Sequence, residues 1–295
     1  MNWLKYKWLF FAISALFLIP GIYSLVRFGL KPAIDFTGGT MLELKFEQEI
    51  EISRYEDIKR VFKEKDFAVS SIQASGEGNL LLRLAPISRE GVEEIKEVLG
   101  EEFEETPQEV RMETVGPTLG QELLRKTAMA IFLAAGFILA YVAWRFKNPK
   151  FGICAILAMF HDSLILLGSF SLLGHFFGVE VDTLFVTAVL TILSFSVHDT
   201  VVVYDGIRES QRLSPQTSFE VLANQAINKT VVRSLNNSLT IIFMLVALLL
   251  LGGETIRWFV AAFLIGTVSG TYSSTFVAVP LVVVWENLVQ KKTKS

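Results

Sequence analysis

The sequence contains a single cysteine, Cys154, and this residue lies inside an apolar run. An intrachain disulfide therefore cannot form, and neither a cysteine-rich zinc cluster nor a redox pair of cysteines is present. The Walker pattern of ATP hydrolases is also missing, so the sequence does not indicate an ATPase. We expect a chain that is not an enzyme and that needs no cofactor and no metal.

Charged residues are scarce as well, at 19% of the chain, and they cluster between apolar runs. The hydrophobic set makes up 52% of the residues, and the mean hydropathy is +0.47. This composition predicts a polytopic α-helical membrane protein, with no role in nucleic-acid binding. The first run resembles a signal peptide, but its length predicts a retained span. Six runs reach the roughly 20 residues that cross a bilayer, and they lie near 8–26, 127–144, 151–173, 184–204, 231–251 and 259–285.

Lysine and arginine residues are concentrated on one side of these runs. The connections on the other side, 174–183 and 252–258, contain only Arg257. The positive-inside rule predicts that both termini and the 205–230 loop are cytoplasmic, and that the long segment after the first span is exported. We therefore expect three parts, which are the N-terminus with the first span (1–30), the exported domain (31–123) and the other five spans (124–295).

The exported segment has the pattern of a folded α+β domain. Ser88 fits the start of its second helix, and Gly100 fits the end of that helix. The order βαββαβ predicts a ferredoxin-like domain, which is usually a binding or docking module. Alternation predicts strands at 40–46, 67–73, 80–84 and 109–115, and helical spacing predicts helices at 53–65 and 88–99.

The 205–230 loop has a helix-start signal of its own. Thr217-Ser-Phe-Glu220 follows Pro215 and forms a capping-box pattern. We expect an amphipathic helix to lead from this pattern into the fifth span.

The most unusual residue of the fourth run is Asp199. Val201 to Val203 follow it and resume the apolar pattern, so its carboxyl group is expected at bilayer depth. An unpaired carboxylate costs several kcal/mol there. Arg233 begins the fifth run at a similar depth, and we expect it to pair with Asp199. Such a pair either exchanges the arginine for a proton, as in a proton-driven switch, or anchors two helices as a static ion pair.

Other polar residues of the runs extend this candidate proton path. His161 and Asp162 lie near the middle of the third run, and His198 precedes Asp199. A hydrogen bond that packs neighbouring helices explains Asp162 equally well. The candidates for a polar lining are Thr200, Asn236, Asn237 and Ser238.

Glycines indicate close approach at two places. Gly266 and Gly270 have the GxxxG spacing that lets helices pack closely, and a sliding surface is the sharper alternative. The segments 34–40 and 115–120 flank the exported domain and are predicted to form its stem. The stem residues of interest are Asp35 and two glycines that permit unusual backbone angles, Gly38 and Gly39.

Several segments together resemble the SecF family of the bacterial and archaeal Sec protein-export machinery. They span almost the whole chain in the family's order, and DFTGGT at 35–40 combined with DTVVVYD at 199–205 is specific. The chain departs from the family pattern at Ser194-Phe195, His198 and Gly206, where Gly-Tyr, Asn and Arg are common. The other matching segments are Val115–Thr118, His161-Asp162, Ile207–Glu209, Arg233 with the polar residues after it, and Gly270–Ser274.

The resemblance implies one half of an RND-like exporter, with SecD as the partner that supplies the other half. It implies that the pair assists late protein export and draws on the proton gradient. Asp199 and Arg233 match family positions associated with proton transport, and a titratable His198 beside them would alter or join the relay. The implied partners are SecD, the SecYEG channel, YajC, the unfolded exported polypeptide and the lipid bilayer of the cytoplasmic membrane.

Three other functions were weighed against this one. A half of an RND-type small-molecule exporter needs larger outer domains than the 31–123 segment provides. A passive scaffold that stabilises SecD needs no proton path. An intramembrane aspartyl protease, suggested by Asp162 and Asp199, needs a Gly-x-Gly-Asp segment that the sequence lacks.

Overall fold

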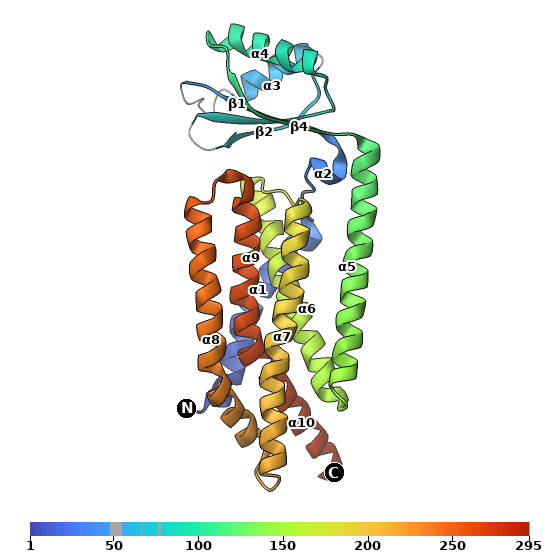
Figure 1. Cartoon of the computed structure of the whole chain (residues 1–295), viewed down its shortest axis with the longest axis vertical. Coiled ribbons are helices and arrows are strands. Elements are labelled where there is room, and N and C mark those ends of the chain that lie inside the picture. Colours follow the sequence, from blue (N-terminus) through green and yellow to red (C-terminus); the bar gives the residue numbers. More distant parts are fainter. Residues whose placement is uncertain (48–54, 66, 76–77, 295) are drawn as a thin grey trace. The chain divides into compact units, whose positions relative to one another are not determined.

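The chain divides into two compact units in the computed structural model (Figure 1). The described residues are 1–47, 55–65, 67–75 and 78–294. The helical unit comprises Met1–Lys31, Ala130–Val179 and Leu184–Ser295, and the sheet unit comprises Pro32–Met129 and Glu180–Thr183.

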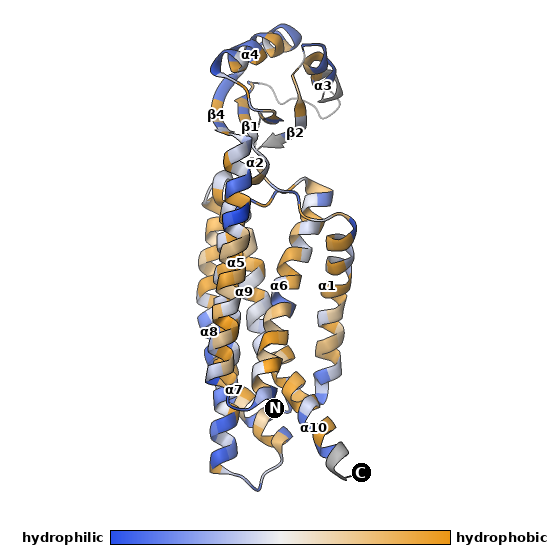
Figure 2. Ribbon diagram, turned by 90° about the vertical axis from the view of Figure 1, so that its right-hand side faces the viewer, coloured by the Kyte–Doolittle hydropathy of each residue, from blue (hydrophilic) through white to orange (hydrophobic). Residues whose placement is uncertain are grey.

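Six helices in the described part of the chain are long and apolar enough to cross a membrane, which confirms the predicted number of spans. Figure 2 shows apolar residues along most of their length. The sixth span is not a regular α-helix, because α9 (Glu254–Ser273) passes through a π turn, η3 (Ser274–Ala278), into α10 (Val279–Lys294). The other spans are α1 (Lys7–Arg27), which the 3-10 turn η1 (Trp3–Tyr6) precedes, α5 (Pro117–Arg145), α6 (Pro149–Phe177), α7 (Thr183–Leu213) and α8 (Phe219–Leu251).

The helices extend beyond the apolar runs that predict them. The 205–230 loop is mostly helical, since α7 ends at Leu213 and α8 begins at Phe219. Backbone hydrogen bonds continue through polar residues, so a helix does not end where its apolar pattern ends. The helix expected after residues 217–220 is present, but its N-cap is Ser218, and the Ser218 side chain makes no capping hydrogen bond. The predicted capping box at Thr217 is therefore wrong.

The sheet unit contains a four-stranded antiparallel sheet in the order β2-β3-β1-β4. The elements follow the predicted order along the chain. Because α3 and α4 share one apolar core with the strands, both helices cover the same face of the sheet (Figure 1). The bounds are α2 (Ile34–Thr37), β1 (Gly39–Lys45), α3 (Tyr55–Glu64), β2 (Val69–Ser75), β3 (Asn79–Leu84), α4 (Arg89–Phe103) and β4 (Gln108–Val115). Part of the predicted 53–65 helix, at 53–54, lies outside the described residues.

Helix α4 begins as predicted and ends later than predicted. The Ser88 side chain accepts a hydrogen bond from the Gly91 amide at 3.4 Å. The helix then runs through Gly100 to Phe103. A Cβ atom at Gly100 would lie 3.2 Å from the Thr106 hydroxyl oxygen, so this glycine permits the close return of the chain and does not end the helix.

Candidate functional site

The Asp199 carboxylate is held by hydroxyl groups from two other elements. Asp199 lies on α7 and is half-buried. The Ser234 hydroxyl on α8 lies 2.9 Å from its Oδ1 and 2.7 Å from its Oδ2. The Ser274 hydroxyl, at the first residue of the π turn, donates to Oδ2. We call Asp199, Ser234 and Ser274 the Asp199 cluster.

The predicted ion pair between Asp199 and Arg233 is absent. No ion pair joins them among the described residues, and the Arg233 side chain is exposed. Consecutive residues of an α-helix point about 100° apart. Because buried Ser234 faces α7, its neighbour Arg233 faces outward, although both residues lie at nearly the same depth.

Asp162 on α6 is the more deeply buried carboxylate, with 1% of its surface exposed. Ser196 on α7 and Ser273 on α9 donate to its Oδ2 at 2.5 Å each, and Ser269 on α9 donates to its Oδ1 at 2.7 Å. The His161 Nδ1 lies 3.0 Å from Oδ1. We call these five residues the Asp162 cluster. It joins three helices through one carboxylate.

Sequence reasoning did not identify any of these serines as a partner of the two carboxylates. Small residues such as serine are common in apolar runs where helices pack closely, so a serine there is not by itself a site candidate. The available signal was their spacing. Ser269 and Ser273 lie one helical turn apart on one face, and Ser274 follows directly.

Hydroxyl donors give these sites a particular chemistry. Hydrogen bonds to the ionised form stabilise a carboxylate in a low-dielectric environment. A serine hydroxyl also carries lone pairs, so it can accept a hydrogen bond from a protonated carboxyl group. Arginine and lysine have no such acceptor. Neutral hydroxyl partners can therefore accompany either protonation state of Asp199 without leaving a buried charge behind.

The other path candidates are divided between the interior and the surface. Thr200 is fully buried, and its hydroxyl has no hydrogen-bond partner among the described residues. The buried Ser238 hydroxyl lies 2.6 Å from that of Thr271. His198, Asn236 and Asn237 are exposed on the helical unit. The predicted polar lining thus contains two buried residues and two exposed ones.

The two glycines of the GxxxG pair are not equivalent. A Cβ atom at Gly266 would overlap the buried Ile192 side chain of α7, whereas one at Gly270 would lie 3.6 Å from Ser196, an ordinary contact. A second close crossing joins α1 to α6, where a Cβ at Gly168 would lie 2.6 Å from the Gly21 Cα. This crossing gave no sequence signal, because its glycines lie far apart in the chain.

The stem segments pack against each other within the sheet unit. Gly38 and Gly39 have φ angles of +74° and +135°, and a Cβ at Gly38 would lie 2.7 Å from the Pro117 Cα. The Asp35 carboxylate accepts hydrogen bonds from the Thr183 amide at 3.1 Å and from the Thr183 hydroxyl at 2.8 Å. It therefore caps the first residue of α7, where a negative charge is favourable.

An ion pair between Arg83 and Glu180 lies in the same unit. Burial lowers the pKa of the Arg83 guanidinium, and the Glu180 carboxylate opposes that shift. The pair joins β3 to the 180–183 segment that precedes and begins α7.

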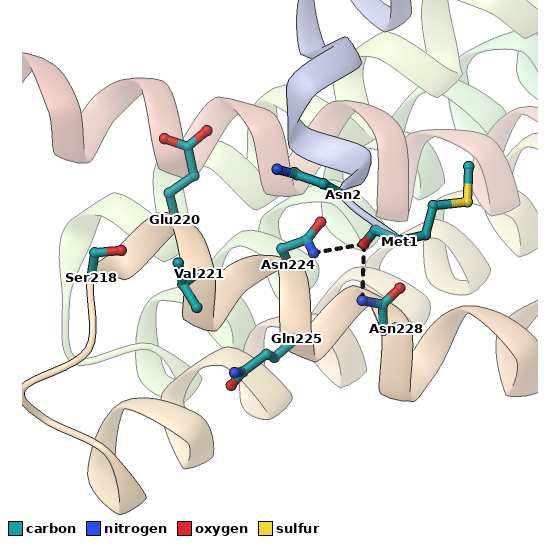
Figure 3. A pocket seen from close by; sticks show the side chains of 8 residues that line it. All are labelled: Met1, Asn2, Ser218, Glu220, Val221, Asn224, Gln225 and Asn228. Atoms are coloured by element: carbon teal, nitrogen blue, oxygen red, sulfur yellow. Dashed lines mark hydrogen bonds between the residues drawn. The ribbon is translucent and has the colours of Figure 1, made fainter.

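A polar hollow of about 550 Å³ lies beside the N-terminus in the helical unit (Figure 3). The Asn224 and Asn228 side chains donate to the Met1 carbonyl at 2.7 and 3.1 Å. None of the residues that line the hollow belongs to either carboxylate cluster. They are Met1, Asn2, Ser218, Glu220, Val221, Asn224, Gln225 and Asn228.

Within the described ranges, no group of three or more His, Cys, Asp or Glu side chains is placed to hold a metal ion. Six helices of membrane-spanning length and apolar composition in the described part of the chain indicate a multi-pass membrane protein. The chain belongs to the SecD/SecF family of protein-export membrane proteins. The family model for the SecD/SecF C-terminal region matches residues 95–288, and the model for the SecD/SecF GG motif matches residues 23–50.

Known relatives agree with this assignment. Protein translocase subunit SecF of Thermobaculum terrenum is 42% identical over 96% of this chain and 93% of its own length. The subunit of the same name from Anaerolinea thermophila is 37% identical over 97% of this chain and 94% of its own length. The crystal structure of SecDF from Thermus thermophilus, a translocon-associated membrane protein, superposes with a TM-score of 0.84 at 36% identity. That match covers 97% of this chain and 39% of the SecDF chain, so the predicted SecF resemblance is confirmed.

Proposed function

We propose that this chain is an auxiliary SecF-type subunit of the Sec translocase, which works with SecD to couple proton movement to late protein export. The observation that carries the proposal is the Asp199 cluster. A carboxylate at bilayer depth is expensive and marks a functional site by default. Its partners are two hydroxyl groups that suit both the ionised and the protonated form.

The exposed polar residues of α7 and α8 support a partner subunit. Arg233, Asn236 and Asn237 are exposed at helical spacing on one side of α8. Hydrocarbon chains cannot satisfy such groups, so a protein surface or a water-filled path must cover them. We assign that role to SecD, because the Thermus thermophilus relative is a single SecDF chain of which this chain matches 39%. On α7, the matching exposed residues are Ser194 and His198.

The sheet unit is proposed to be the exported domain, predicted at 31–123 and of ferredoxin-like fold, that engages the emerging polypeptide. Its support is the antiparallel order β2-β3-β1-β4 with both helices on one face. The positive-inside pattern supports cytoplasmic termini in the cytoplasmic membrane. SecYEG and YajC are proposed as neighbours because of the family membership.

Export into inverted membrane vesicles tests this function. Vesicles with SecD and the wild-type chain are compared with vesicles that carry Asp199→Asn, with and without a proton gradient. We expect the gradient-stimulated part of export to disappear in the variant, because asparagine cannot release a proton. Glu209→Gln is the matched control. It removes a negative charge from an exposed position of the same helix and should leave the stimulation unchanged.

The outcomes separate the competing functions. If Asp199→Asn assembles with SecD and still responds to the gradient, the proton path fails and a passive scaffold explains the chain. If the gradient drives efflux of small molecules while polypeptide export is unaffected, the chain is half of an RND-type exporter.

A further inference from the structure

The sixth span contains a π turn, Ser274–Ala278, between two α-helical segments. π turns are rare, occur mostly as single turns inside α-helices, and are frequent at functional sites. This turn begins with Ser274, which donates to Asp199. The preceding residue, Ser273, donates to Asp162 at 2.5 Å. Two consecutive residues of one helix therefore contact the carboxylates of both clusters.

Helix α7 holds both ends of the π turn. Asp199 accepts the Ser274 hydroxyl at the first end. The Tyr204 hydroxyl, on a fully buried side chain, donates to the Ala278 carbonyl at the other end at 2.8 Å. The Tyr204 contact does not depend on a carboxylate, but the Ser274 contact does. A change of charge on Asp199 thus acts on one end of the turn only.

The middle of the turn contacts the N-terminal segment. The Phe276 ring lies 4.6 Å from the ring of Phe10 and 5.5 Å from that of Trp3. Trp3 in turn donates through its amide to Asn224 and through its indole nitrogen to Asn228, both at 2.8 Å. A movement of Phe276 would therefore change the contacts of residues 3–10 and of the start of α8.

We propose that Ser274 is a positioning residue: through its hydroxyl, the charge on Asp199 determines whether the π turn is held or loosened. Phe276 transmits this change in the turn to residues 3–10. The ionised carboxylate accepts the Ser274 hydroxyl and holds the turn. A protonated carboxyl group is a weaker acceptor, and the hydroxyl then turns to the Thr271 carbonyl, which already lies 3.1 Å away. The turn loosens as a result. This inference deepens the proposed proton coupling, on which it rests.

Other ionisable groups surround the Asp199 cluster on the packed helices. Arg233 is exposed on α8 and His198 is exposed on α7, so neither side chain takes the place of the hydroxyl groups at the Asp199 carboxylate. The groups to be considered in any titration of the cluster are His161 and Asp162 on α6, His198 and Tyr204 on α7, Arg233 on α8, and Tyr272 on α9.

Amide hydrogen exchange of the full chain in lipid nanodiscs tests the proposal without a gradient or an export substrate. Asp199→Asn stands for the protonated state. We expect exchange at residues 275–282 to rise at least about tenfold, the lower end of what a hydrogen bond to a charged group contributes. Ser274→Ala should give the same rise, and the double variant should give no more than either single one. Ser274→Thr keeps the hydroxyl and should exchange like the wild type.

Two further variants complete the design. Ser169→Ala is the matched control, because that hydroxyl bonds to the Ile165 carbonyl of its own helix and, among the described residues, to no other group. It should leave exchange at 275–282 unchanged. Phe276→Leu should keep the response of 275–282 to Asp199→Asn but remove the accompanying rise at residues 3–10.

The inference is overturned if Asp199→Asn leaves exchange at 275–282 unchanged while residues 13–25 of α1 remain protected. It is also overturned if the effects of Asp199→Asn and Ser274→Ala add in full. A failed export assay with a responsive turn would refute proton-driven export alone, so the two proposals fail separately.

Discussion

Replacement of Gly266 by alanine gives a sharp test of the packing between α7 and α9. The new Cβ would overlap Ile192, which is β-branched and only 2% exposed, so it has little room to move. Overpacking costs about 1–3 kcal/mol, and alanine returns up to about 1 kcal/mol through its better helix propensity. Three Ile192 atoms would lie closer to the new Cβ than real contacts allow, which places the overpacking at the upper end of its range. We therefore expect Gly266→Ala to lower the free energy of unfolding by about 2 kcal/mol.

The assay is reversible unfolding of the purified chain in mixed micelles, followed by circular dichroism. Two glycines serve as matched controls. A Cβ at Gly136 on α5 would meet nothing within 4 Å, and one at Gly270 would make ordinary contacts. Both alanine variants should be as stable as the wild type or more stable by up to about 1 kcal/mol, because only the helix propensity changes.

A second-site change separates this contact from a general effect. Ile192→Ala alone leaves a cavity, but with Gly266→Ala the new methyl group fills part of that space. The double variant should therefore be more stable than the sum of the two single effects predicts, by about 1 kcal/mol. Strict additivity, or a neutral Gly266→Ala, would refute the proposed tight crossing.

Three other changes test individual contacts. Gly39→Ala should destabilise the sheet unit by about 2–4 kcal/mol, since φ is +135° and the new Cβ would lie 2.8 Å from a backbone oxygen. Pulse proteolysis measures this loss of stability. Gly116 has open space around it, so an equal effect of Gly116→Ala would contradict the prediction. Tyr204→Phe should lower stability by about 1–2 kcal/mol through the lost hydrogen bond to the π turn, and unchanged unfolding in micelles would show that the bond is not needed. Thr183→Val removes the 2.8 Å hydrogen bond to Asp35 and should cost about 1 kcal/mol, whereas Thr183→Ser should match the wild type in the same assay.

The helices and strands were largely predictable, because hydrophobic periodicity is a local property of the sequence. The position of Asp199 inside a helix of membrane-spanning length was predictable for the same reason. The direction of each side chain around its helix was not. Arg233 and Ser234 are equally plausible partners by depth, and only the packing of α8 against α7 selects the serine.

The hydroxyl clusters and the π turn depend on helix–helix register, which one sequence does not contain. Ser196 and Ser269 are ordinary small residues until α7 and α9 are placed beside Asp162. Gly100 shows the same limit in the sheet unit. This glycine was expected to end the helix, but in the structure it permits the close approach of Thr106.

A direct measurement of proton flux is the strictest test of the central claim. That claim is that the Asp199 carboxylate, within its cluster of serine hydroxyl groups, binds and releases a proton. The chain is reconstituted with SecD and the translocase in proteoliposomes that contain a pH-sensitive dye. The account predicts that export-dependent proton entry occurs with the wild type and disappears with Asp199→Asn. Equal proton entry in both would contradict it.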